Sequence, residues 1–439
     1  MATQASTIPA IDTLAQFAAT ASSVAHGERI SVHAADAVIA LLAGRSSPEG
    51  RAIFDFFART EGSPLAMISA NAAAMRLSEI DDIHRPSAVT ASAIAMPSAL
   101  GILGLTSASP QRFADALFVG QELSVRLALA LGGASLMAQG LWPSYLVAPF
   151  GAAATAARML GLAPERMRHA LALALAQTPR MVGRSAGSRP GRWLLFGNAI
   201  RSGCLAALAA ADGIDGDPEL LNLAWLQAIG GTAADAGLLA PSSDMAAALQ
   251  QFSIKPHCAA KQTLAAVHGL RLLMAAGLAP ATLESIEVAV PMAYAGMIDR
   301  EPPSAGRLAS MVSVRWQLAL AALQPALLDD VARDPLPTDR ALDAFAARVR
   351  VRGDATLDGW FPQSWPARLA VNTKTTRHEI LVKDSPGDPA LRFGIAAVED
   401  KARRVLGAHP AAHLVAQGFE APFKAAPLDD LCKYFSVGF

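Results

Sequence analysis

The chain has 439 residues, of which 52% are hydrophobic and 17% charged, and its 37 basic side chains balance its 37 acidic ones. This balance, with only 6% aromatic residues, argues against a basic nucleic-acid surface and a base-stacking platform, so we expect no nucleic-acid partner. So few charges cannot coat every helix of a large monomer, and we therefore expect a homodimer that buries apolar faces.

Helical periodicity continues up to about residue 252, interrupted by short Gly and Pro segments. Closely spaced Ala and Gly residues predict helices whose axes approach one another closely. The clearest predicted helices cover residues 33–44, 146–161 and 164–177, with Ser31 as the expected cap of the first.

An acid and histidine cluster stands in an otherwise apolar part of this region. Glu79, Asp81, Asp82 and His84 fall within six residues. Carboxylates between apolar helices lose water, and a neighbouring histidine can act as an acid/base partner. The alternative is that the acids cap a helix and His84 lies on a surface loop. We predict that Asp81 and His84 are catalytic and that Glu79 and Asp82 bind substrate.

Arginine and glycine alternate in residues 179–203. Glycines let a ligand approach the backbone, and guanidinium groups match carboxylates in a bidentate manner. No P-loop or dinucleotide fingerprint is present, so a small anionic ligand is the expected partner. The alternative is a surface loop with solvated arginines. We predict that Arg184 and Arg192 bind the substrate.

A third cluster lies in residues 255–268, where the helical pattern ends. Clefts at domain junctions are common ligand sites. Lys261 is predicted to be a catalytic acid/base group, and His257 is predicted to bind substrate. Cys258 is interpreted as a small buried thiol rather than a nucleophile, because the sequence identifies no residue that would activate it.

From Phe252 onward strands alternate with helices. We predict a mainly α chain: a large all-α helical domain, residues 1–252 and 393–439, and a smaller inserted α+β lid domain, residues 253–392. The predicted elements of the second part are helices 259–277, 308–323, 338–349 and 393–407, strands 283–292, 366–374 and 376–384, and a turn at 385–389.

Neither a metal nor a cofactor is expected. His409 and His413 have helical spacing, but Pro410 separates them and no acid or thiol is near in sequence. The three cysteines are widely separated, no secretory signal begins the chain, and no apolar run reaches spanning length. We therefore predict a cytoplasmic protein with no membrane partner, which performs proton transfer on an anionic substrate.

The order of these features resembles the MmgE/PrpD family, which includes 2-methylcitrate dehydratase, cis-aconitate decarboxylase and iminodisuccinate epimerase. The resemblance covers about residues 30 to 405. It implies a large all-α domain with a small α+β lid, a homodimer, and a site between the two domains. It also implies cofactor-free lyase or isomerase activity beside the carboxylates of small di- and tricarboxylates. The segments that carry the resemblance are SEIDDIHRPSAV, FGAAATAARMLGLAPERM, RWLLFGNAIRSG, KPHCAAKQTLAA and SPGDP.

The chain departs from the family pattern at five positions. Ile83 replaces a threonine, Trp142 a histidine, Arg192 the catalytic lysine, Gln262 the histidine of the lid and Trp316 its tyrosine. A guanidinium stays protonated, so Arg192 can bind a carboxylate but is a poor general base. The resemblance to the family implies that three of the changed positions bind substrate, namely Trp142, Gln262 and Trp316. These changes indicate a divergent subgroup with another substrate.

The chain is accordingly predicted to be a cofactor-independent lyase or isomerase that abstracts a proton next to a carboxylate or carbonyl of a small di- or tricarboxylate-like anion. A hydro-lyase, either dehydratase or hydratase, is favoured. Epimerisation or decarboxylation of a related substrate is one alternative. The other is a catalytically silent relative that binds a ligand or serves as a scaffold.

Overall fold

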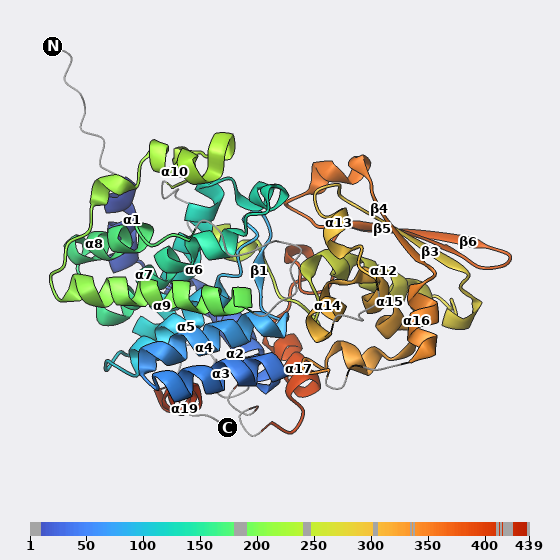
Figure 1. The fold of residues 1–439 in the computed structure, drawn as a ribbon, viewed down its shortest axis with the longest axis horizontal. Helices are drawn as coiled ribbons and strands as arrows, with labels where there is room; N and C mark the ends of the chain where they lie inside the picture. The colour runs from blue at the N-terminus through green and yellow to red at the C-terminus, as the bar shows by residue number, and fades with distance from the viewer. Residues whose placement is uncertain are drawn as a thin grey trace, which may run out of the picture.

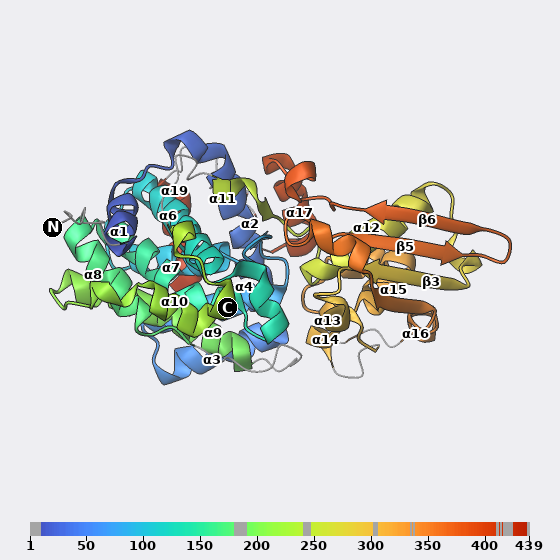
Figure 2. The same ribbon diagram turned by 90° about the horizontal axis from the view of Figure 1, so that it is seen from above.

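The chain forms a helical body joined to a smaller body that contains a sheet, and both views show the two lying end to end (Figure 1, Figure 2). The predicted mainly α fold is confirmed. The computed structural model describes residues 10–179, 191–239, 247–301, 306–333, 336, 339–409, 412, 415 and 425–436.

The helical body is built from thirteen described α-helices that pack around one large apolar core. They are α1 (Ala10–Thr20), α2 (Gly27–Ser46), α3 (Pro48–Thr60), α4 (Pro64–Ser78), α5 (Ser92–Leu103), α6 (Pro110–Ala130), α7 (Pro143–Leu160), α8 (Pro164–Leu175), α9 (Gly191–Ala211), α10 (Leu223–Gly230), α11 (Ala247–Gln250), α17 (Ile395–Leu406) and α19 (Ala425–Ser436).

Three of these helices begin with the same Ser-Pro device. Ser47, Ser63 and Ser109 each accept a hydrogen bond from a first-turn backbone N–H, at 3.1, 3.1 and 3.2 Å. Each is followed by proline at the first helical position. The hydroxyl satisfies a donor that the helix leaves unpaired, and proline loses nothing there because its missing N–H would have had no partner.

Small residues let the central helices approach closely, as predicted. A Cβ atom at Gly197 of α9 would lie 2.1 Å from the backbone oxygen of Ser69 in α4. No side chain fits at that distance, so the α4–α9 contact requires glycine.

The lid consists of helices packed on one four-stranded sheet of order β4-β3-β5-β6. β3 and β4 run parallel, and the other neighbours run antiparallel. Apolar side chains of the sheet and of α12 and α15 form its core. The elements are α12 (Lys261–Ala275), β3 (Ser285–Val290), α13 (Ala295–Ile298), α14 (Arg307–Val312), α15 (Val314–Leu323), α16 (Arg340–Ala346), β4 (Val349–Gly353), β5 (Ala367–Asn372) and β6 (Arg377–Val382).

Two short strands and several single turns complete the described structure. The strands are β1 (Ile83–His84) and β2 (Phe252–Ser253), which pair antiparallel. The 3₁₀ turns are η1 (Val24–His26), η2 (Gly133–Gln139), η3 (Pro218–Leu220), η4 (Gly231–Ala233), η5 (Ala236–Leu239), η6 (Pro280–Thr282), η7 (Pro325–Leu328), η8 (Ala355–Trp360) and η9 (Pro389–Leu391).

The structure corrects three predicted elements. The predicted helix 338–349 ends at Ala346, because residues 349–353 alternate apolar and basic side chains and pair with β3. The predicted helix 308–323 is divided at Ser313, whose hydroxyl caps the second part. Ser31 does not cap a helix, because α2 begins four residues earlier and buries it. The predicted hairpin of β5 and β6 is present.

The two cores exchange side chains across the predicted domain boundaries, which stay a prediction. Ile254, Cys258 and Met311 belong to the predicted lid but pack in the core of the helical body. Conversely, Ile83 packs in the core of the lid. The segment that follows α4 therefore crosses from one core to the other, which places the acid cluster at the junction.

The described residues contain one helix, α9, that is long and apolar enough to cross a membrane, and the bent pair of α6 and η2 would add a second. One face of α9 is buried against α4, α7 and α8. A core helix passes the same test of length and composition, so no described helix is a clear membrane span.

The carboxyl group of Glu122 in α6 generates a stability prediction. It is 0% exposed, and Arg126 lies 3.7 Å away. Burial raises the pKa of Glu122 to about 8, against the opposing charge of Arg126. Between about pH 4.5 and about pH 8, Glu122 is protonated in the folded chain and ionised in the unfolded chain. Each rise in pH over this range therefore favours the unfolded chain, and Glu122 lowers the free energy of unfolding.

We expect Glu122→Gln to stabilise the fold at pH 8 by more than about 1 kcal/mol and to change little at pH 5, because the amide removes the ionisation at similar volume. Urea unfolding at both pH values measures this. An equal effect at the two pH values would show that Glu122 does not ionise with a raised pKa.

Candidate functional site

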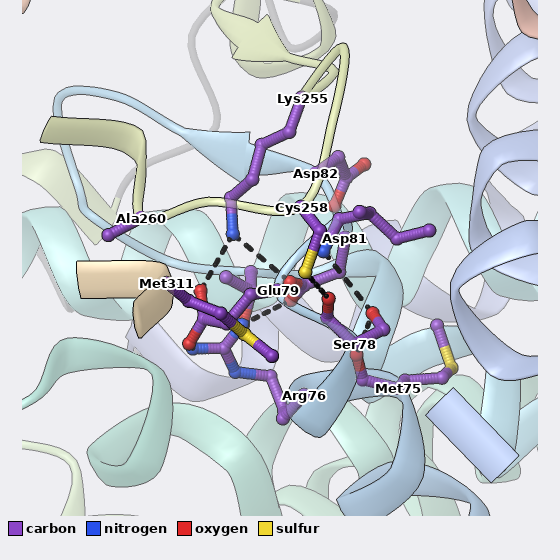
Figure 3. A network of polar contacts seen from close by, with 12 residues as sticks. Met75, Arg76, Ser78, Glu79, Asp81, Asp82, Lys255, Cys258, Ala260 and Met311 are labelled. Atoms are coloured by element: carbon purple, nitrogen blue, oxygen red, sulfur yellow. Dashed lines mark hydrogen bonds and ion pairs between the residues drawn. The ribbon is translucent and has the colours of Figure 1, made fainter. Parts of the chain in front are cut away.

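A buried cluster of four charged side chains lies where α4 meets the segment after β2 (Figure 3). The Asp81 carboxylate is 0% exposed and accepts from Arg76 Nη1 at 2.5 Å and from Lys255 Nζ at 3.2 Å. The same Lys255 Nζ donates to Glu79 Oε2 at 3.2 Å, and Arg76 Nη2 lies 4.0 Å from Glu79 Oε1. The four charges therefore balance inside the protein.

The local backbone fixes this arrangement. Helix α4 ends at Ser78, and Glu79 takes the left-handed conformation with φ 52°. The Glu79 carbonyl accepts from the backbone N–H of Ala259, and the Cys258 thiol donates to the Ser78 carbonyl at 3.0 Å. The end of α4 is thus bonded to the segment that carries Lys255.

Mutual attraction keeps the cluster charged. Burial alone would raise the pKa of Glu79, but the charges of Lys255, Arg76 and Arg192 outweigh it and hold the pKa below its ordinary value. Burial alone would lower the pKa of Lys255, but the charges of Asp81 and Glu79 outweigh it and raise the pKa. Lys255 is therefore a cation at neutral pH.

Arg192 adds a further positive charge from the first turn of α9. Its guanidinium lies 3.9 Å from the ring centre of Trp193 and 5.4 Å from that of Trp142, so two indoles flank it. Trp142 precedes α7 and packs against both hydrophobic cores. Burial, eased by the positive charges of Arg192 and Arg76, raises the pKa of the nearby Tyr145 to about 12, so that phenol stays protonated.

His84 is buried in β1 as a neutral imidazole. Its Nδ1 accepts from the backbone N–H of Ser87 at 3.2 Å and from the Ser87 hydroxyl at 2.8 Å, so the ring proton is assigned to Nε2. Burial, assisted by the charge of Arg85, lowers the pKa of His84 to about 3. The surface-loop alternative is wrong, because the ring is 2% exposed.

Asp82 points away from Asp81 into the helical core. Its Oδ2 accepts from His33 Nδ1 at 2.9 Å and from the Ser92 hydroxyl at 2.5 Å, and its Oδ1 accepts from the Ser92 backbone at 3.3 Å. Asp82 was expected to bind substrate. Its partners belong to α2 and α5 of the helical body, so Asp82 joins these helices to the acid segment.

Lys261 belongs to a separate ionic cage. Its Nζ lies 2.7 Å from Asp388 Oδ1 and 3.1 Å from the Ser385 hydroxyl, and Ser253 donates to the same carboxylate. Burial lowers the pKa of Lys261 against the opposing charge of Asp388. Gly387 closes the turn with φ 90°, where a Cβ atom would lie 1.9 Å from a backbone oxygen. Among the described residues Lys261 therefore bonds to the turn of the lid and not to Glu79 or Asp81.

The remaining predicted positions lie in different surroundings. His257 is buried with its Nε2 unpaired in the described structure, and burial lowers its pKa to about 3. Gln262 is buried in the first turn of α12. Trp316 is buried in the lid core, where its indole N–H finds no partner among the described residues. Arg184 lies outside the described residues.

Sequence analysis assigned no role to Lys255, the first residue of the third cluster, or to Arg76, which lies three residues before Glu79. The pairing of Ile83 with Ser253 brings Lys255 to the acids. That long-range pairing has no short sequence signal, so the sequence did not show that Lys255 reaches the acids. Among the described residues, no three His, Cys, Asp or Glu side chains come together as a metal site.

The arrangement supports proton transfer on an anion. The Asp81 carboxylate accepts hydrogen bonds from two cations, and Lys255 can donate a hydrogen bond or a proton. The positive groups Arg76, Lys255 and Arg192 exceed the negative groups Glu79 and Asp81 by one charge, three minus two. A substrate carboxylate would offset that excess, and the same cations would stabilise an enolate-like charge.

Part of the chain is similar in sequence to two curated fungal proteins. Part of the chain is 29% identical over 169 residues to cis-aconitate decarboxylase from Aspergillus terreus, covering 37% of this chain and 34% of that protein. It is 26% identical over 185 residues to cis-aconitate decarboxylase-like protein oryM from Aspergillus oryzae, covering 40% of this chain and 38% of that protein. The alignments thus span little more than a third of the relatives' length.

The family assignment rests on a longer match. The pattern of the MmgE/PrpD N-terminal domain fits residues 12–230, and that of the MmgE/PrpD C-terminal domain fits residues 257–417. The two matched ranges cover most of the 439 residues. The chain belongs to the MmgE/PrpD family.

Proposed function

We propose that the protein is a cofactor-independent lyase or isomerase that abstracts a proton next to a carboxylate or carbonyl of a small anionic substrate. The observation that carries this proposal is the Asp81 carboxylate, wholly buried yet bonded to Arg76 and Lys255. A base held beside cations can take a proton from a carbon while those cations receive the resulting negative charge.

Within this proposal Asp81 is the base and Lys255 is the acid that assists departure or reprotonation. Arg192 holds a substrate carboxylate, because a guanidinium binds anions well but gives up protons poorly. His84 acts as a neutral hydrogen-bond donor through Nε2, since its imidazole stays unprotonated. This revises the predicted acid/base pair of Asp81 and His84.

We propose a general class of reaction and, within it, one preferred reaction. Dehydratase or decarboxylase chemistry on a carboxylate is supported by membership of the MmgE/PrpD family and by the similarity to cis-aconitate decarboxylase. Among these we favour a hydro-lyase, because a carboxylate base and an ammonium acid suit removal of a proton and departure of a hydroxyl group. Epimerisation needs the same proton abstraction and is the second candidate.

Solvent exchange tests the proposal without knowledge of the product. We expect the wild-type protein, treated with EDTA, to introduce deuterium from D₂O next to the carboxylate of at least one compound in a panel of small di- and tricarboxylates. Asp81→Asn should lower that rate by about two orders of magnitude or more, because the amide cannot accept the proton. Nuclear magnetic resonance measures the exchange.

The adjacent Asp82→Asn is the matched control. Its side chain supports the helices, so we expect a lower melting temperature but a loss of less than about tenfold in the exchange rate of the folded protein. Equal rate losses in the two variants would remove Asp81 from the role of base. An inactive wild-type protein across the panel would favour the silent ligand-binding or scaffold alternative.

The neutral state of His84 predicts the pH dependence. Because its pKa lies near 3, we expect no change in exchange rate between about pH 5.5 and 8 that depends on His84. The pH profiles of wild type and His84→Gln should therefore run parallel over that range. An inflection near pH 6.5 that is present in wild type and lost in His84→Gln would contradict the neutral-donor role.

We further propose a cytoplasmic homodimer built mainly through the helical body. Leu195 and Leu205 of α9 leave 48% and 41% of their surface exposed, which a second copy would cover. Sedimentation equilibrium at micromolar concentration should give twice the chain mass of 45.5 kDa. A monomer at all concentrations would rule out this assembly.

A further inference from the structure

A buried ion pair connects α2 to α17, the helix that follows the lid. Lys401 of α17 donates from Nζ to Asp36 Oδ1 of α2 at 2.6 Å, and both side chains are at most 1% exposed. The two helices pack against each other beside the lid (Figure 2). The same Nζ donates to the backbone oxygen of Ile80 at 2.8 Å. The pair therefore contacts the acid segment after α4 without joining its charged cluster.

The position of this carbonyl bears directly on Asp81. Ile80 stands between Glu79 and Asp81 and lies outside the helices and strands. Its carbonyl belongs to the same planar peptide group as the backbone nitrogen and Cα of Asp81. No backbone N–H of the described residues is bonded to that carbonyl. The hydrogen bond from Lys401 therefore fixes the plane from which the Asp81 side chain projects.

The acid segment depends on such contacts to keep its conformation. Glu79 has a φ of 52°, which is unfavourable for a residue with a Cβ atom and persists only where the surroundings hold it. Its carbonyl accepts from the backbone N–H of Ala259 at 3.3 Å. The carbonyls of Glu79 and Ile80 are thus held by groups from two distant parts of the chain.

Stability alone does not account for a charged pair at this place. The neighbouring Val398 and Ala402 of α17 pack in the apolar core, as do Ala35 and Ala37 of α2. Apolar side chains of similar volume often stabilise a core as well as a buried ion pair does, because the pair must lose its hydration. Only a hydrogen-bond donor, however, can hold the exposed carbonyl of a peptide group inside the protein.

We propose that Lys401, paired with Asp36, is a positioning residue that holds the base Asp81 in place through the carbonyl of Ile80. This inference rests on the proposed function, because it concerns the base of that reaction. The described bonds of Lys401 are those to Asp36 and to the Ile80 carbonyl. It therefore acts on Asp81 through the backbone and takes no part in proton transfer.

The test removes the pair without leaving one buried charge unbalanced. Asp36→Asn combined with Lys401→Met keeps both side chains near their original volume and removes the donor. Burial raises the pKa of Asp36 only to about 6, against the opposing charge of Lys401, so the wild-type carboxylate is ionised at pH 8. At that pH we expect the maximal rate of deuterium exchange into a substrate to fall about tenfold or more in the double variant. The apparent KM should stay within about threefold, because a displaced base slows the chemical step rather than binding.

Amide hydrogen exchange, followed by mass spectrometry, tests the same inference without a substrate. The peptide that contains residues 79–84 should exchange about tenfold or more faster in the double variant, because a hydrogen bond from a charged group no longer restrains it. Asp36→Asn alone, which keeps the donor but removes its anion, should give smaller changes of the same kind. The single variant also serves if the double variant does not fold.

Asp115→Asn combined with Arg158→Met is the matched control. It removes a 2.8 Å ion pair between α6 and α7, and Arg158 otherwise bonds to the carbonyls of Ala19 and Ala21 near the end of α1. We expect a lower melting temperature, but no change in the maximal rate or in the exchange of residues 79–84.

The outcomes separate the inference from the proposed function. If wild type is active, an unchanged maximal rate in the folded double variant, or an equal loss in the control, would overturn the inference and leave the function standing. If wild type introduces no deuterium into any compound, the proposed function fails and amide exchange decides alone. Unchanged protection of residues 79–84 would then overturn the inference as well.

Discussion

Neutralisation of two buried carboxylates, Glu79 and Asp81, by Lys255 and Arg76 is the constraint on which the domain junction depends. Removing such charges from water costs several kcal/mol each unless opposite charges and hydrogen bonds offset it. One cation comes from the same helix end and the other from a segment about 175 residues later. The end of α4 and the segment after β2 must therefore fold together.

Successive residues of the acid segment, which follows α4, contact different parts of the protein. Asp81 contacts Lys255, whereas Asp82 contacts His33 and Ser92 in the helical core. Three residues later Arg85 pairs with Asp384 and lies 3.8 Å from Asp388, both in the turn of the lid. Extended chain directs neighbouring side chains to opposite sides, which is how one short segment binds both bodies.

The protonation states of the buried side chains restrict which of them can act as an acid or a base. His84 and His257 are buried without an anionic partner, and burial keeps their pKa values near 3. The charges of Asp81 and Glu79 raise the pKa of Lys255, which is therefore held as a cation. In the proposed mechanism, acid/base work therefore falls to a carboxylate and an ammonium group rather than to an imidazole, and the substrate anion binds where positive charge is in excess.

The sequence by itself determined the helical character, the change to an α+β pattern after residue 252, the hairpin of β5 and β6 and the acid segment as the centre of interest. Helix periodicity, strand alternation and charge spacing are local properties, so they are legible along the chain. Only the tertiary structure decided which lysine meets the acids. Strand β4 was not predicted, and the predicted helix 338–349 ran into its first residue, because its parallel partner β3 is distant in sequence. Lys255 rather than Lys261 reaches Asp81 because β1 pairs with β2. That pairing cannot be predicted from the local sequence of either strand.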